Sequence, residues 1–80
     1  MNQATQTIYR HILDEISSGN LRSGAKLPTE VSLSQQFSTS RMNAHAALTR
    51  LKEAKLIVRE KRRGSFVSDT WELEDVKALR

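Results

Sequence analysis

The sequence has no cysteine, a single proline, three glycines and few aromatic residues. Without cysteine the chain has no disulfide framework and no thiolate zinc site, so packing alone must hold it together, which fits a reducing compartment. No run approaches the roughly 20 apolar residues of a membrane span, and the first residues lack the basic start and apolar run of a secretion signal. We therefore expect a soluble, cytoplasmic protein without membrane contact.

A catalytic grouping is also missing. A chain of 80 residues supports one domain with a small core, which disfavours an enzyme with a deep pocket. The carboxylates of Asp14-Glu15 and Glu72-Glu74-Asp75 have no nucleophile or base arranged with them. His11 and His45 stand without cysteine or paired carboxylates at ligand spacing, and we expect His11 at the surface. The sequence thus predicts no enzyme, no metal site and no cofactor.

Positive charge is concentrated in one third of the chain. The formal net charge is +4, from thirteen Lys and Arg against nine Asp and Glu. Between Arg41 and Arg63, eight basic and two acidic residues give +6, which leaves −2 for the remainder. Such a stretch permits an anionic partner such as nucleic acid, although a run of charge taken alone is more often a solvated face.

Apolar spacing and capping residues predict three helices. Residues 5–18 carry an amphipathic pattern that Gly19 is suited to end in a left-handed conformation. A short helix capped by Thr29 should stop near Phe37, and Ser40 should cap a third helix over about Arg41 to Ala54. The third helix has a buried face at helical spacing, formed by Ala44, Ala47, Leu48 and Leu51.

After Lys55 the pattern becomes extended. Residues 56–61 and 65–68 read as two short strands joined by the basic, glycine-containing loop Arg62-Arg63-Gly64. The fold class is therefore mainly α with a small β-hairpin, a winged helix-turn-helix with three helices and a two- or three-stranded wing. Residues 1–69 form this domain, and residues 70–80 are a linker or the start of a missing C-terminal effector-binding domain.

The third helix carries the candidate chemistry. In helix-turn-helix proteins the recognition helix enters the major groove with its N-terminal residues at base edges. Arg41 suits a phosphate or the paired acceptors of guanine, Asn43 suits adenine, and Met42 suits a thymine methyl group. The alternatives are a surface salt bridge for Arg41 and a place inside the core for Met42.

The hairpin tip, about residues 61–65, is the second candidate contact. Arg62 and Arg63 have the charge to enter a minor groove or grip its phosphates, with Gly64 permitting the tight turn. The alternative is an ordinary soluble hairpin tip. A winged-helix module that binds a protein instead of DNA is the competing function, and its binding to duplex DNA would be weak and independent of Arg41 and Arg63. Double-stranded RNA is disfavoured because its deep, narrow major groove hides the bases.

Four separate segments, in this order and spacing, resemble the N-terminal domain of the GntR family. They are Gly24-Ala25-Lys26-Leu27-Pro28-Thr29-Glu30, Ser40-Arg41-Met42-Asn43, Ala47-Leu48 with Leu51, and Arg63-Gly64-Ser65-Phe66-Val67. The resemblance covers about Thr5 to Ser68. It implies a bacterial transcription regulator, a repressor or less often an activator, whose C-terminal domain binds a small-molecule effector and forms a homodimer on a palindromic operator of double-stranded DNA.

Carried over by position, the resemblance implies DNA contacts at Arg41, Asn43, His45 and the wing. Two positions depart from the family pattern. Val31 stands where a basic residue is usual, and His45 stands where arginine is usual, which removes two expected positive charges. The complete set of candidate contacts is Ser40, Arg41, Met42, Asn43, His45, Thr49, Arg62, Arg63 and Gly64.

Overall fold

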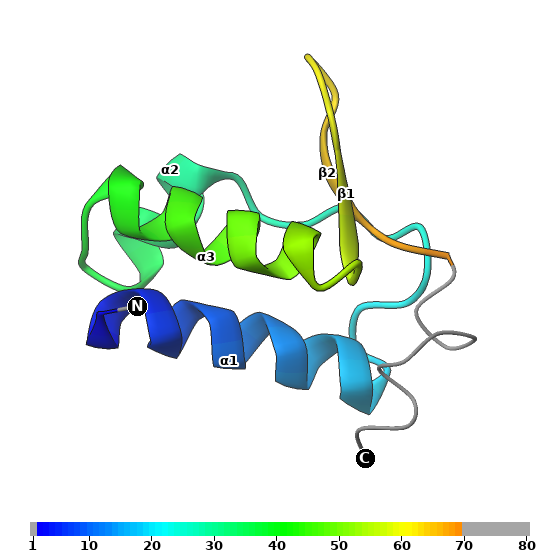
Figure 1. Cartoon of the computed structure of the whole chain (residues 1–80), viewed down its shortest axis with the longest axis horizontal. Coiled ribbons are helices and arrows are strands. Elements are labelled where there is room, and N and C mark those ends of the chain that lie inside the picture. The colour runs from blue at the N-terminus through cyan, green and yellow to red at the C-terminus, as the bar shows by residue number, and fades with distance from the viewer. Residues whose placement is uncertain (1, 70–80) are drawn as a thin grey trace.

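The computed structural model describes residues 2–69, so the linker expected over residues 70–80 lies outside the described residues. The elements are α1 (Gln3–Ser18), α2 (Glu30–Gln36), α3 (Arg41–Glu53), β1 (Ile57–Glu60) and β2 (Gly64–Val67). Helices α1 and α2 both pack on α3, and the hairpin of β1 and β2 projects away from the helices (Figure 1). This confirms the predicted class, a winged helix-turn-helix. No helix within the described range is long and apolar enough to cross a membrane.

Helix α1 begins two residues earlier than the apolar pattern predicts. The side chain of Asn2 caps it by accepting a hydrogen bond from the Thr5 amide at 2.8 Å. Gly19 ends the helix as predicted, with a φ of 91° that a residue without Cβ adopts freely. His11 lies at the surface as expected, with its side chain 41% exposed. Its ring is half-buried and packs edge-on against Phe37, with the ring centroids 5.2 Å apart.

The turn between α2 and α3 depends on one residue with a left-handed backbone. Ser38 has a φ of 51°, and the amide of Thr39 next to it donates to the carbonyl of Ser34 at 2.9 Å. This is the usual way in which the last carbonyls of a helix find a donor, although glycine is the common residue at that place. Ser40 then caps α3 as predicted, since its hydroxyl accepts from the amide of Asn43 at 3.2 Å.

One small core joins the helices to the base of the hairpin. The predicted face of α3 is buried, and it meets isoleucines of α1 and the apolar start of the hairpin. Because the core side of α3 is fully used in packing, its opposite side is the one left free for a ligand. The buried apolar residues are Ile8, Ile12, Ile16, Leu27, Leu33, Ala44, Ala47, Leu48, Leu51, Leu56, Ile57 and Val67.

The wing is a two-stranded antiparallel hairpin in which Ile57 pairs with Val67 and Glu60 with Gly64. Lys55, with a φ of 64°, turns the chain out of α3 and into β1. A third strand is reduced to a single bridge between Lys26 and Phe66. The hydrogen bond from the Leu27 amide to the Ser65 carbonyl, 2.8 Å long, helps to tie that segment to β2. The wing is thus anchored on two sides at its base, while its tip extends into solvent.

Candidate nucleic-acid interface

The predicted recognition helix presents its N-terminal side chains to solvent. Met42 is 81% exposed, which excludes its alternative place in the core. The side chain of Arg41 is 70% exposed. Ser40 uses its hydroxyl as the helix cap, and Thr49 lies half-buried further along α3. The first turn of α3 therefore offers a cation and an apolar group on one surface, as major-groove recognition requires.

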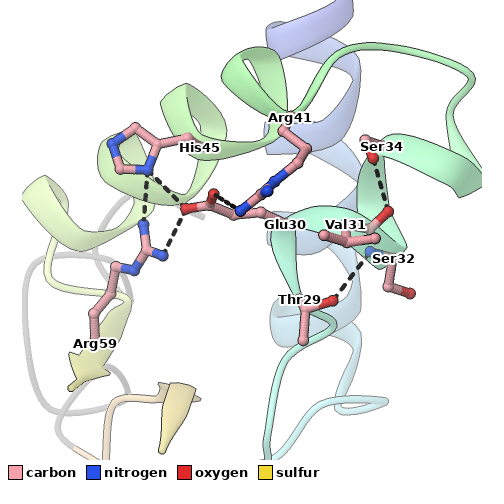
Figure 2. A network of polar contacts seen from close by, with 8 residues as sticks. All are labelled: Thr29, Glu30, Val31, Ser32, Ser34, Arg41, His45 and Arg59. Atoms are coloured by element: carbon pink, nitrogen blue, oxygen red, sulfur yellow. Dashed lines mark hydrogen bonds and ion pairs between the residues drawn. The ribbon is translucent and has the colours of Figure 1, made fainter. Parts of the chain in front are cut away.

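A carboxylate lies between the recognition helix and the wing. Figure 2 shows Glu30, the first residue of α2, with the side chains of Arg41, His45 and Arg59 turned toward it. Its Oε2 accepts from Arg59 Nη2 at 2.8 Å and lies 2.7 Å from His45 Nδ1. Arg41 is further away, with 3.9 Å between its Nη2 and Oε1 of Glu30. We call these four residues the Glu30 corner.

Hydrogen-bond chemistry fixes the histidine tautomer in this corner. A carboxylate oxygen only accepts, so the Nδ1 of His45 must carry the proton that it shares with Glu30. The 3.5 Å approach of Arg59 Nη1 to the same Nδ1 is then a contact between two donors and not a second hydrogen bond. Nε2 of His45 is consequently the ring nitrogen left to meet a ligand.

The acid of the corner stays ionised. Hydrogen bonds first from Arg59 and then from His45 lower the pKa of Glu30 below its ordinary value, and their positive charge acts in the same direction. Partial burial opposes this shift but is outweighed. The side chain of Glu30 is 19% exposed, so it is a negative charge held at the floor of a positively charged surface.

The side chain of Asn43 forms hydrogen bonds with other residues of the chain. Its Nδ2 donates to Thr39 Oγ1 at 2.6 Å, and its Oδ1 accepts from Asn2 Nδ2 at 2.9 Å and from Thr5 Oγ1 at 3.4 Å. These bonds join the start of α1 to the first turn of α3. The use of Asn43 to read adenine stays a prediction, and it requires that these internal bonds be exchanged for bonds to the base.

The tip of the wing carries three exposed basic residues. Lys61, Arg62 and Arg63 form a three-residue turn closed by a hydrogen bond from the Arg63 amide to the Glu60 carbonyl at 3.0 Å. Arg62 has a φ of 69° and Gly64 a φ of 115°, so the predicted need for glycine at position 64 is confirmed. All three basic residues of the turn are exposed. Arg63 makes an ion pair of 3.2 Å with Glu60 and lies 5.8 Å over the ring of Phe66.

An open groove of about 620 Å³ runs between α3 and the wing. Basic side chains dominate its walls, and Glu60 is its one acidic lining residue. The groove brings together His45 and Thr49 from α3 with Arg62 and Gly64 from the wing, all four of which the sequence had singled out. The further lining residues are Lys52, Arg59, Glu60 and Lys61.

Glu30 and Arg59 belong to this surface, although neither is among the candidate contacts that the sequence predicts. In the sequence, Glu30 belongs to the family motif and complements the positive N-terminal end of a helix, and Arg59 is one of several charges on an expected strand. The sequence does contain a signal for Arg59. It lies on an expected strand directly before the basic loop, so its side chain can extend the charged surface of that loop. No local signal points to Glu30, since only the fold brings it to Arg59, which is 29 residues later.

Comparison with known proteins agrees with this geometry. Residues 4–67 match the model of the family described as bacterial regulatory proteins, gntR family. Two relatives from Bacillus subtilis (strain 168) are similar in sequence: the HTH-type transcriptional regulator YcbG, 41% identical over 66 residues, and the HTH-type transcriptional repressor NagR, 37% identical over 70 residues. Each alignment covers 82% of this chain, but only 28% of YcbG and 29% of NagR.

Solved structures extend the similarity to the fold. The DNA-binding domain of AraR in complex with operator ORR3 superposes with a TM-score of 0.80 at 29% sequence identity, over 85% of this chain and 82% of that one. The chain therefore belongs to the gntR family of bacterial regulatory proteins, and residues 2–69 form the winged helix-turn-helix DNA-binding domain of that family. It spans less than a third of the length of the two relatives from Bacillus subtilis.

Proposed function

We propose that this domain binds a specific sequence in double-stranded DNA and acts within a cytoplasmic, metabolite-responsive repressor. In this proposal α3 lies in the major groove and the tip of the wing lies in the minor groove or on its phosphates. Residues 1–69 are the DNA-binding unit, and residues 70–80 lead into a C-terminal domain that binds the effector and makes the protein a homodimer. Each domain then reads one half of a palindromic operator.

The observation that carries the proposal is the positively charged groove between α3 and the wing. Exposed Arg41 and Met42 lie at one end of the same helix, and Arg62 and Arg63 are exposed at the projecting tip of the wing. Two cationic elements separated by a groove match a duplex, whose phosphates border both of its grooves. Operator complexes of the AraR domain and the repressor NagR, as described above, support the same function.

The roles of the contact residues follow from their chemistry. Arg41 and Met42 give base choice, with a guanidinium for guanine and a thioether near a thymine methyl group. Asn43 adds a contact to adenine when DNA displaces its internal partners. Ser40 directs the N-terminus of α3 and its free amides at a phosphate. His45, Thr49 and the wing residues Arg62, Arg63 and Gly64 complete the surface.

Selection from random duplexes, followed by salt titration, tests this function. We expect the selected duplexes to share a half-site, and the chain to bind a selected duplex more tightly than a scrambled one of equal length. If each chain neutralises four phosphates, the logarithm of the binding constant falls against the logarithm of salt concentration with a slope of roughly −3.6. A flat salt dependence together with no enriched sequence would contradict the proposal and favour a protein-binding module.

A further inference from the structure

The Glu30 corner places an acid where a DNA-binding surface is expected to be uniformly basic. The side chain of Glu30 is 19% exposed. It pairs with three basic side chains, those of Arg41, His45 and Arg59. A carboxylate at such a place repels phosphates and lowers affinity for every duplex. Its position at the start of α2 makes the charge tolerable for the fold, because helix N-termini favour acids, but does not account for its three cationic partners.

The carboxylate of Glu30 links three elements of the fold. Glu30 is on α2, His45 is on α3 and Arg59 is on β1. The last two meet at the same oxygen, Oε2, at 2.7 and 2.8 Å. Such short bonds to an ionised group are about twice as strong as neutral ones. They fix where the cation of the wing base lies relative to the recognition helix.

The degree of restraint falls from the wing base outward. The side chain of Arg59 is 28% exposed, that of His45 is 61% exposed and that of Arg41 is 70% exposed. Arg59 is thus the most covered of the three, while Arg41 lies 3.9 Å from the acid and is mostly exposed. A guanidinium held in one orientation cannot adjust to the phosphate positions of an arbitrary sequence. When a matching site presents acceptors in the right place, the same guanidinium loses less conformational entropy on binding.

We infer that Glu30 is a positioning residue that sets DNA discrimination: by holding Arg59 and His45, and restraining Arg41, it lowers affinity for non-matching duplexes more than for the matching one. The inference rests on the proposed function and assigns to that interface a residue that touches no base. It also explains why an acid stands among basic residues, because discrimination improves when a wrong partner is disfavoured as well as when a right one is favoured.

The isosteric variant Glu30→Gln removes the charge and keeps the shape. With the 80-residue chain, dissociation constants are measured for a duplex selected by the parent and for a scrambled duplex. We expect affinity for the scrambled duplex to rise about threefold to eightfold, since one phosphate-repelling charge is lost. Affinity for the selected duplex should stay level or fall, so the ratio of the two constants drops by at least about threefold.

Glu60→Gln is the matched control. It removes the acidic residue that lines the cationic groove, and Glu60 pairs only with its neighbour Arg63 among the described ion pairs. Both duplexes should bind it more tightly by the same factor, which leaves the ratio unchanged. If Glu30→Gln behaves like this control, the inference is wrong and Glu30 is only a local charge.

A second variant guards against an effect of misfolding. Arg59→Lys keeps both the charge of the corner and Glu30, but it loses the planar guanidinium that holds the carboxylate. We expect a discrimination ratio about threefold lower with an unchanged salt slope. An unchanged ratio in this variant, with its thermal unfolding equal to that of the parent, overturns the inference. A parent chain that discriminates no duplex refutes the proposed function itself, whereas a discriminating parent with unaffected variants refutes only the role of Glu30.

Discussion

The Glu30 corner and the wing tip are both basic, but they hold their cations in opposite ways. In the corner, Glu30 accepts from Arg59 at 2.8 Å and lies 2.7 Å from the ring of His45, two residues from different elements. At the tip, Arg62 and Arg63 are exposed, and the ion pair recorded for Arg63 is with Glu60, three residues away on the same hairpin. The corner joins cations from different elements through one carboxylate, whereas the cations of the tip are exposed and the ion pair described there stays within the hairpin.

The difference separates two contributions to DNA binding. Exposed cations at the end of a projecting hairpin can reach the phosphates of any sequence, so they add affinity that depends on salt and not on sequence. Restrained cations at the base of a groove suit a fixed geometry, so they contribute to the choice of sequence. The corner and the tip therefore make different predictions for the same pair of measurements, affinity and discrimination.

The largest effect is expected at the tip. The double variant Arg62→Ala and Arg63→Ala should weaken binding to selected and scrambled duplexes alike, on the order of fiftyfold near 0.1 M salt, and should make the salt slope shallower by about 1.8. The double lysine variant is the control, since it keeps the charge and should recover most of the affinity. A loss of affinity confined to the selected duplex would contradict the assignment of sequence-independent affinity to the tip and of discrimination to the corner.

A smaller and more selective effect is expected for Arg41 at the edge of the corner. Arg41→Ala should cost about 2 kcal/mol on the selected duplex, much less on the scrambled one, and relax the preference at one base pair. Arg10→Ala is the matched control, because Arg10 is exposed and lies two residues from the buried Ile8 and Ile12, on the opposite face of α1. Equal losses on both duplexes would show Arg41 to be a phosphate anchor.

The smallest effect concerns the stability of the free domain. Because its partners lower the pKa of Glu30 in the folded chain, the stabilisation is present above the ordinary carboxyl pKa and is lost as pH falls through the lowered value. Glu30→Gln should therefore be less stable than the parent at pH 7, by about 1 kcal/mol. The difference in free energy of unfolding, followed by urea denaturation, should shrink toward pH 3. A difference that stays constant would mean that the charge of Glu30 does not stabilise the fold.

Much of the fold was predictable because its signals are local. The cap residues Thr29 and Ser40 directly precede their helices, Gly19 follows α1, and a basic loop with Gly64 separates two short extended runs. Each feature depends on neighbours within a few residues, so it can be recognised without knowing the tertiary structure. The start of α1 was misjudged because its cap, Asn2, lies before the apolar pattern begins.

Two features of the turns were not predictable in the same way. Ser38 and Lys55 adopt the left-handed backbone that usually selects glycine. Nothing in their side chains signals this, because packing of α2 and of the wing base on α3 imposes the turns.

The hydrogen bond between Asn43 and Asn2 was not predictable either. The two residues are 41 positions apart, and no spacing rule indicates such a pair.

By itself the sequence determined three capped helices, a hairpin with a basic tip and the face of α3 that is buried, because periodicity and capping act over a few residues. It also determined the concentration of positive charge between Arg41 and Arg63. Only the tertiary structure decided which of these charges are restrained. The acid that restrains them comes from α2, and contacts between distant elements exist only once the core has brought α2, α3 and β1 together.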